Sequence, residues 1–252
     1  MFDQLAPKLA AKDLTAVILA GGQGTRIRHL VPNVPKPMVS VLGKPFVEWI
    51  VRYLADQGIE RVIISTGFKA EIVDNYFKAH PVKSVSIACV AENEPLGTAG
   101  GFLNAVRHSN EDPVAWLVLN GDSLVLADLE PLIEFLNEPG TSGALLGVSV
   151  PDAARFGTLQ VSSSNDLLGF LEKRNGAGII NAGVYLFRPQ VLDFFVDQSR
   201  LSFEVDVFPK LAANNAGIKV SISDAPFIDI GTPETLLLAE GFLRSANIPI
   251  HA

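Results

Sequence analysis

Short apolar runs alternate with more polar segments along the first half of the chain. The runs that we expect to form buried strands lie at 15–20, 61–66, 84–90 and 114–120. The segments that follow them predict helices at 45–57, 70–79, 98–107 and 129–137. Because near-continuous apolar strands alternate with helices, we expect an α/β fold with a mostly parallel, doubly wound sheet and helices on both faces.

The alternation changes after residue 140. We expect strands at 144–150, 181–187, 218–223 and 227–231, with an antiparallel pair at 158–162 and 167–173. Helices are expected near 189–197, 204–215 and 233–245. The chain shows no internal repeat and no linker, so we predict one domain, 1–252, with a mixed sheet. Its two halves would be about 14–140 and about 141–245.

Composition narrows the class of protein. The 252 residues are 48% hydrophobic and 19% charged, which is typical of a folded globular chain. A net charge of −7 argues against a nucleic-acid-binding protein, and the single cysteine, Cys89, excludes a disulfide framework or a thiolate metal cluster. No apolar run is long enough to cross a bilayer, and the first 13 residues do not resemble a signal peptide. We therefore expect a cytoplasmic protein that binds neither nucleic acid nor membrane.

A glycine-rich loop directly follows the first predicted strand. In the segment LAGGQGTR (19–26), three glycines in four positions let the backbone turn tightly and approach a ligand closely. Successive backbone N–H groups in such a turn can cradle an anion. The spacing matches neither the P-loop nor the dinucleotide-binding fingerprint. The loop therefore predicts a phosphate site of another kind.

Positive charge surrounds this loop. No Asp or Glu occurs between residues 14 and 47, whereas Arg26, Arg28, Lys36 and Lys44 all lie there. In a chain of net charge −7, this is a local positive field. Lys36 stands between two prolines, which restrict the backbone and place its ammonium group reproducibly. A glycine turn or a basic turn alone would be an ordinary surface feature, but together they favour phosphate binding.

The loop and its basic neighbours resemble the signature of the sugar-1-phosphate nucleotidyltransferases. The resemblance rests on LAGGQGTRIRHL and PKPMV, and it extends from about Thr15 to Glu240. Later motifs that fit are EPLGTAGG (94–101), NGDS (120–123), NAGVYLF (181–187), SFEVD (202–206) and FIDIGTPE (227–234). Among the subfamilies, the combination is most similar to the D-glycero-D-manno-heptose 1-phosphate guanylyltransferases.

The resemblance implies a nucleotide-binding first half and a sugar-phosphate-binding second half. A sugar 1-phosphate would attack the α-phosphorus of a nucleoside triphosphate in line and release pyrophosphate, with no covalent enzyme intermediate. It also implies a Mg²⁺ ion held by Asp122 and Asp229. The residue pattern alone leaves two other interpretations open, in which Asp122 caps a turn and Asp229 pairs with an arginine.

The resemblance also assigns the individual site residues. The expected catalytic groups are Arg26, Lys36, Asp122 and Lys173. The expected nucleotide-binding residues are Leu19, Ala20, Gly21, Gly22, Gly24, Thr25, Arg26, Glu92, Gly97 and Thr98. The expected sugar-phosphate-binding residues are Gly157, Glu172, Lys173, Asn181 and Glu204. The 202–206 segment departs from the family at Val205, where many relatives have Lys.

The segment 92–101 should face the base of the nucleotide. An ionised Glu92 only accepts hydrogen bonds. Guanine offers two adjacent donors, N1–H and N2–H₂, on one edge, and these suit a carboxylate. Thymine and uracil offer one donor flanked by acceptors, which suits an amide better. The sequence therefore favours GTP.

Other functions remain open at this point. Within the same chemistry, the chain could be a mannose-1-phosphate guanylyltransferase or a uridylyl- or thymidylyltransferase of another hexose 1-phosphate. A catalytically silent, nucleotide-binding regulatory subunit is a further alternative, but it would have lost charged groups that are all present here. As for assembly, a homodimer is the default expectation.

Overall fold

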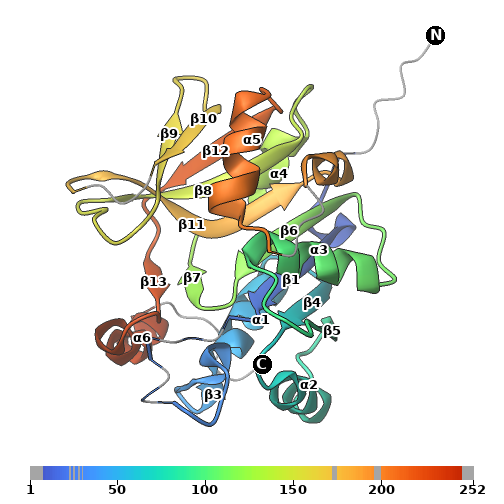
Figure 1. Cartoon of the computed structure of the whole chain (residues 1–252), viewed down its shortest axis with the longest axis vertical. Coiled ribbons are helices and arrows are strands. Elements are labelled where there is room, and N and C mark those ends of the chain that lie inside the picture. Colours follow the sequence, from blue (N-terminus) through green and yellow to red (C-terminus); the bar gives the residue numbers. More distant parts are fainter. Residues whose placement is uncertain are drawn as a thin grey trace.

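Residues 8–22, 24, 26–27, 29, 31–171, 175–195 and 200–245 are described by the computed structural model. Within them, nine strands form one sheet in the order β10-β9-β11-β6-β1-β4-β5, with β8 also paired to β11 and β12 paired to β8 (Figure 1). The strands are β1 (Leu14–Ala20), β4 (Arg61–Thr66), β5 (Ser86–Ala91), β6 (Ala115–Asn120), β8 (Gly143–Val150), β9 (Thr158–Val161), β10 (Leu167–Leu171), β11 (Gly178–Phe187) and β12 (Ile218–Ser223).

The first half of the sheet is parallel. Strand β1 pairs in parallel with β4 on one side and with β6 on the other, and β5 pairs in parallel with β4. The chain thus builds outward from β1 to β5 and then returns to the opposite side of β1. In such a sheet, a crevice opens beyond the carboxyl ends of the strands where the strand order reverses. The fold therefore predicts a binding site beyond the ends of β1, β4 and β6.

The second half joins this sheet in the opposite sense. Strand β11 is antiparallel to β6, β8 and β9, so the predicted mixed sheet is confirmed. Two small sheets lie apart from it: β2 (Ser40–Val41) with β3 (Lys44–Pro45), and β7 (Ser123–Val125) with β13 (Phe227–Asp229). The second pair brings the chain near residue 229 beside the end of β6.

Helices cover both faces of the sheet. They are α1 (Phe46–Asp56), α2 (Ala70–Ala79), α3 (Thr98–His108), α4 (Glu130–Leu136), α5 (Phe208–Ala213) and α6 (Pro233–Ser245). Alternate residues of β1 face opposite ways, so Ala16 and Ile18 pack in one core with α1, α2, α4 and α6. Val17 packs in the other core with α3 and α5. The doubly wound prediction is therefore confirmed.

Some predicted elements differ from the structure. The helix expected at 189–197 is a 3₁₀ helix, Pro189–Phe194, which begins at a proline. The single helix expected at 204–215 begins as a π-helical turn, Phe203–Val207, and continues as α5. Residues between 120 and 129 contain β7, which the sequence interpretation missed because a three-residue strand has no readable periodicity.

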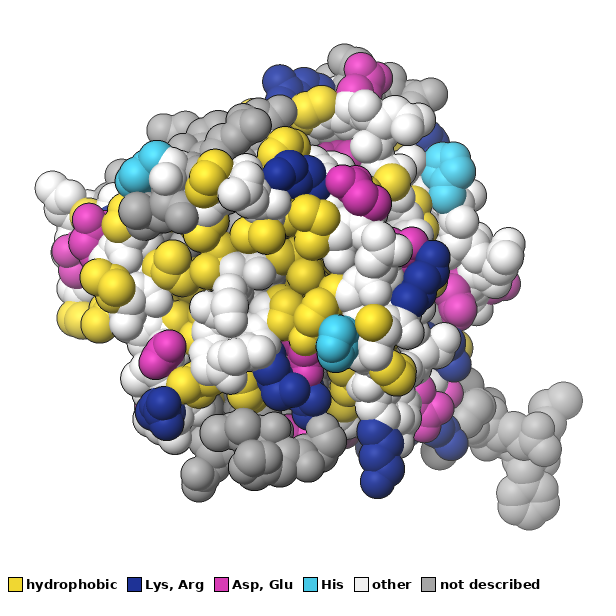
Figure 2. All heavy atoms as spheres, turned by 90° about the horizontal axis from the view of Figure 1, so that it is seen from below, with side chains coloured by type: hydrophobic (Ala, Val, Ile, Leu, Met, Phe, Trp, Pro, Cys, Tyr) yellow, Lys and Arg dark blue, Asp and Glu magenta, His cyan; other side chains and the backbone are white. Residues whose placement is uncertain are grey.

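Some apolar side chains are exposed on the surface of the protein. No helix in the described ranges is both long and apolar enough to cross a bilayer. Figure 2 shows hydrophobic side chains gathered near the middle of the face seen from below, with charged side chains around them. At the lower end of the molecule in Figure 1, helix α6 exposes Leu237 and Leu238, which are 83% and 64% accessible.

Candidate functional site

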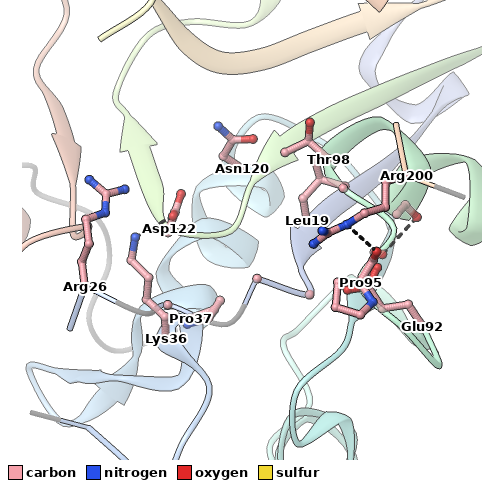
Figure 3. Close-up of a pocket in the computed structure, with 17 residues that line it drawn as sticks. Leu19, Arg26, Lys36, Pro37, Glu92, Pro95, Thr98, Asn120, Asp122 and Arg200 are labelled. Carbon is pink, nitrogen blue, oxygen red and sulfur yellow. Dashed lines mark hydrogen bonds and ion pairs between the residues drawn. The ribbon is translucent and has the colours of Figure 1, made fainter. Parts of the chain in front are cut away.

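A cavity of about 510 Å³ opens beyond the carboxyl ends of the parallel strands. Its lining residues are Leu19, Gly21, Gly22, Gly24, Arg26, Lys36, Pro37, Ser65, Glu92, Pro95, Gly97, Thr98, Gly101, Asn120, Asp122, Arg200 and Gly231. Figure 3 shows Arg26, Lys36 and Asp122 gathered at one end of the cavity and Glu92, Pro95 and Arg200 at the other. The cavity therefore has a strongly charged end and a second end framed by a carboxylate and loop backbone.

An ion pair dominates the charged end. The Lys36 ammonium lies 2.6 Å from Oδ2 of Asp122, and the lysine side chain is only 7% exposed. Lys36 begins a short 3₁₀ helix, Lys36–Met38, and the prolines on either side of Lys36 fix the backbone as the sequence predicts. Asp122 is separated from the end of β6 by one residue, Gly121. Because its carboxylate remains 37% exposed toward the cavity, it can still reach a ligand.

Asp229 lies on the strand next to Asp122. The backbone N–H of Ile230 donates to the Asp122 carbonyl over 2.9 Å, and Asp229 pairs in register with Ser123. Oδ1 of Asp229 accepts from the Gly231 N–H. A Cβ atom built on Gly231 would lie 3.2 Å from the Lys36 ammonium, so the ammonium also lies beside this turn. Asp229 itself does not line the cavity, whereas Gly231 does.

This pair of carboxylates fits a magnesium ion. Magnesium is held in enzymes by one or two carboxylates, with phosphate and water oxygens completing the shell. No cluster of three or more His, Cys, Asp or Glu side chains in ligating arrangement occurs among the described residues. Two carboxylates on paired segments would suit an ion whose remaining ligands are phosphate and water oxygens. The Lys36 ammonium supplies positive charge to Asp122.

Glu92 forms the opposite end of the cavity. It follows β5, and its backbone N–H donates to the Thr66 carbonyl over 2.7 Å. A Cβ atom on Gly21 would lie 2.3 Å from Oε1 of Glu92, and one on Gly67 would lie 2.7 Å from it. The carboxylate therefore packs directly on two glycine backbones. Any side chain at Gly21 would displace it, which gives this glycine of the loop a steric role beside its turn geometry.

The electrostatic environment of Glu92 disfavours its charge. Burial raises the pKa of this carboxyl group above the ordinary value of 4.5, and the Leu96 N–H and the positive charge of Arg200 only partly offset that effect. The Leu96 N–H lies 3.4 Å from Oε2. Burial penalises an ionised group that lacks enough polar partners. A ligand that donates hydrogen bonds to Glu92 would relieve this penalty.

Three of the expected sugar-binding residues, Gly157, Asn181 and Glu204, are not among the residues that line this cavity. The N–H of Asn181 donates to the Gly157 carbonyl over 3.0 Å, so those two residues are neighbours. The Asn181 amide nitrogen donates to the Tyr185 hydroxyl over 2.7 Å, and its oxygen accepts from the Gly183 N–H over 3.1 Å. These bonds fix the orientation of the Asn181 side chain.

Glu204 is joined to the cavity through Thr98. The Thr98 hydroxyl donates to Oε2 of Glu204 over 3.2 Å, although the two residues are 106 positions apart. Ala20 is buried at the end of β1 and does not line the cavity. Thr25, Glu172 and Lys173 lie outside the described residues. The predicted ligand contacts of all these residues stay predictions.

Several lining residues were missed by the sequence interpretation. Arg200 is the clearest case, because its guanidinium donates to the Pro95 carbonyl over 3.1 Å and frames the end of the cavity that holds Glu92. Only its position just before the 202–206 motif could have indicated it. Asn120 is the last residue of β6 and Ser65 the last but one of β4, and these positions at the carboxyl ends of parallel strands would have been a signal.

Comparison with known proteins points to one family. A family model described as "Nucleotidyl transferase" matches residues 15–246. D-glycero-alpha-D-manno-heptose 1-phosphate guanylyltransferase of Aneurinibacillus thermoaerophilus is 37% identical over 92% of this chain and 99% of its own length. Mannose-1-phosphate guanylyltransferase of Mycobacterium tuberculosis is 35% identical over 97% of this chain and 68% of its own length.

A solved structure shares the fold at similar identity. The crystal structure of HddC from Yersinia pseudotuberculosis complexed with GMP-PN superposes with a TM-score of 0.77 at 37% sequence identity. The match covers 91% of this chain and 99% of that chain. The resemblance expected from the sequence motifs is therefore confirmed, together with the fold class.

One glycine of the cavity wall can be tested through stability. Gly97 has a φ of +80°, and a Cβ there would lie 2.5 Å from the Leu201 carbonyl oxygen. Gly140 has a φ of +82°, but a Cβ there meets nothing within 4 Å. We expect Gly140→Ala to lower the free energy of unfolding by about 1–2 kcal/mol and Gly97→Ala by about 3 kcal/mol or more. Urea titration of both variants measures the difference, and equal losses would contradict the steric contact.

Proposed function

Because the chain belongs to the nucleotidyl transferase family, we propose that it is an enzyme that joins GTP to D-glycero-α-D-manno-heptose 1-phosphate. The products are GDP-heptose and pyrophosphate. The observation that carries the proposal is the cavity that collects the glycine loop, Arg26, Lys36 and Asp122 at the carboxyl ends of the parallel strands. The relatives support the choice of nucleotide and sugar, since a heptose 1-phosphate guanylyltransferase matches nearly end to end.

The reaction brings two anions together. An oxygen of the sugar 1-phosphate attacks the α-phosphorus in line, and pyrophosphate leaves from the opposite side. An anionic nucleophile needs no strong general base, so catalysis consists of positioning and charge stabilisation. Arg26 and Lys36 neutralise the triphosphate and the departing pyrophosphate. Because Lys36 is held in place before substrate arrives, little reorganisation is needed when charge develops.

Asp122 and Asp229 are the proposed Mg²⁺ ligands, since they stand on paired segments and match the preference of this ion for carboxylate oxygen. When bound, such an ion supplies Lewis-acid stabilisation of phosphate oxygens. In the proposed complex, the Lys36 ammonium would donate to a phosphate oxygen of the nucleotide, while its backbone, fixed by Pro35 and Pro37, stays in place. The lysine thus contributes charge to whichever anion lies beside it.

Glu92 is the proposed reader of the guanine base. Its carboxylate accepts the adjacent N1–H and N2–H₂ donors, whereas uracil and thymine present no such pair. The half-buried carboxylate beside Gly21 supports this role, because a bound guanine would supply the donors that it lacks. Leu19, Gly22, Gly24 and Gly97 line the same cavity and complete the proposed nucleotide site, with Thr25.

The second half of the chain would hold the sugar phosphate. Gly157, Asn181 and Glu204 are proposed to contact the sugar, and Glu172 and Lys173 the hydroxyls and the phosphate. The division into two halves at about residue 140, a cytoplasmic location and a homodimer all stay predictions. Light scattering on the purified protein measures the last of these.

Mannose 1-phosphate is the second candidate substrate, because a mannose-1-phosphate guanylyltransferase matches at 35% identity. The two candidates are separated by measuring pyrophosphate release with GTP, UTP, dTTP and ATP against heptose, mannose and glucose 1-phosphates. The proposal expects the highest kcat/KM for GTP with the heptose phosphate. A preference for UTP or dTTP would contradict the role of Glu92, and a preference for mannose 1-phosphate would replace the sugar.

Lys36→Ala should abolish most of the activity without unfolding the protein. Removing one preorganised charge-stabilising group costs about 10²–10³ in rate, so we expect at least that loss in kcat. Lys78→Ala is the matched control, because Lys78 is an exposed lysine that pairs with Asp74 within α2. Circular dichroism verifies folding of both variants. Near-normal turnover by Lys36→Ala would refute the assigned role.

The raised pKa of Glu92 predicts a pH dependence of GTP binding. Only the ionised carboxylate accepts both guanine donors, and its proton is gained at a higher pH than that of an ordinary glutamate. The dissociation constant for GTP should therefore increase as the pH falls toward the pKa of Glu92, which is raised above the ordinary value of 4.5. Glu92→Gln should bind GTP more weakly at pH 7 and lose this pH dependence. Calorimetric titration of both proteins checks it, and parallel pH profiles would contradict base reading by Glu92.

A further inference from the structure

Two segments that are far apart in the sequence are bonded together at the wall of the cavity. Residues 95–100 belong to the first half of the chain and residues 200–204 to the second. The Leu201 N–H donates to the Leu96 carbonyl over 2.8 Å, and the Leu201 carbonyl accepts from Ala99 and Gly100 over 3.0 and 3.1 Å. The proposed base loop and the segment that carries Glu204 are therefore one connected piece of structure.

Thr98 lies at the centre of this connection. It is the first residue of α3, and its hydroxyl accepts the Phe203 N–H over 3.0 Å. The same hydroxyl donates its only proton to Oε2 of Glu204 over 3.2 Å. Its donor is therefore already used by the protein. One lone pair is left to a ligand, although Thr98 lines the cavity.

Glu204 is held at one oxygen and open at the other. Oε2 accepts from Thr98 and, over 2.8 Å, from the Ser202 hydroxyl. No described residue donates to Oε1, so this oxygen is available to a ligand. Two hydrogen bonds from different segments fix a carboxylate more firmly than one, because its side-chain torsions then have no free rotation.

We propose that Thr98 is a positioning residue for the sugar phosphate, which acts through Glu204, and that its side chain is not a nucleotide ligand. The inference rests on the proposed function, in which Glu204 contacts a sugar hydroxyl. Thr98 orients the carboxylate so that Oε1 faces the sugar. Thr98, which belongs to the segment proposed to bind the nucleotide, thereby sets the affinity for the sugar 1-phosphate.

The Glu204 segment keeps its place without Thr98. Phe203 is fully buried, and its ring stacks on Phe187 and Phe208 with centroids 6.0 and 5.5 Å away. The backbone bonds of Leu201 also remain. Replacing Thr98 by the isosteric Val should therefore leave the protein folded while it releases one of the two bonds to Oε2 and leaves the Phe203 N–H without this acceptor.

The test compares Thr98→Val, Thr98→Ser and Thr15→Val. The control, Thr15, is a buried threonine whose hydroxyl bonds Glu111 over 3.4 Å at the opposite end of β1, so it removes a similar contact far from the cavity. For each variant, KM is measured for both substrates by pyrophosphate release, and the dissociation constant for GTP by calorimetry. Thermal unfolding verifies that each variant is folded.

We expect Thr98→Val to raise KM for the sugar 1-phosphate about tenfold, the scale of one lost hydrogen bond to a charged group, and to leave GTP binding within about twofold. Thr98→Ser and Thr15→Val should stay near the wild type. Adding Thr98→Val to Glu204→Gln should produce a smaller loss than adding it to the wild type, because the two residues act as a unit.

Other outcomes would overturn the inference. Weaker GTP binding by Thr98→Val with an unchanged KM for the sugar phosphate would make Thr98 a nucleotide ligand. Equal effects of the Thr98 and Thr15 variants would make its role purely structural, and so would full additivity with Glu204→Gln. An inactive wild type would refute the proposed function as a whole, whereas an active wild type with an insensitive Thr98 refutes this inference alone.

Discussion

The geometry of the site depends on the way β1 is shared. One edge of β1 pairs with β4 and the other edge with β6. Because all three strands are parallel, the connections that follow them leave the sheet at the same end. The glycine loop that follows β1 lines the cavity at this end of the sheet. The cavity is thus a consequence of strand order, and the residues at the strand ends decide what it holds.

The two ends of the cavity differ in the charged groups that line them. The Lys36–Asp122 pair lies at one end and the half-buried Glu92 at the other, and they are joined by a loop with little side-chain bulk. A nucleoside triphosphate also has two unlike ends: a charged triphosphate and an uncharged base rich in hydrogen-bond donors and acceptors. The proposed function assigns the two ends of the cavity to the triphosphate and to the base of one nucleotide, and a site formed before binding would reduce the entropy that binding must overcome.

Much of the fold could be predicted from the sequence because its strands are buried and apolar. Strand β1 was predicted at 15–20 and runs Leu14–Ala20, and α2 was predicted with its observed bounds. Arg26 and Lys36 could be predicted as site residues because they stand in a stretch without acids. Arg200 was missed, since its place depends on tertiary bonds to Pro95 that no local pattern records. The π-helical turn at 203–207 was missed for the same reason, as it accommodates Phe203 in an aromatic cluster.

The late position of β13 in the chain has a consequence for biosynthesis. Strand β13 pairs with β7 across more than 100 residues, and Gly231 completes the cavity wall beside Lys36. A chain emerging from the ribosome therefore contains the glycine loop and Lys36 long before it contains β13 and Gly231. Nascent chains can assemble the parallel strands early, but the part of the cavity wall at Gly231 is added only after more than 100 further residues have been made.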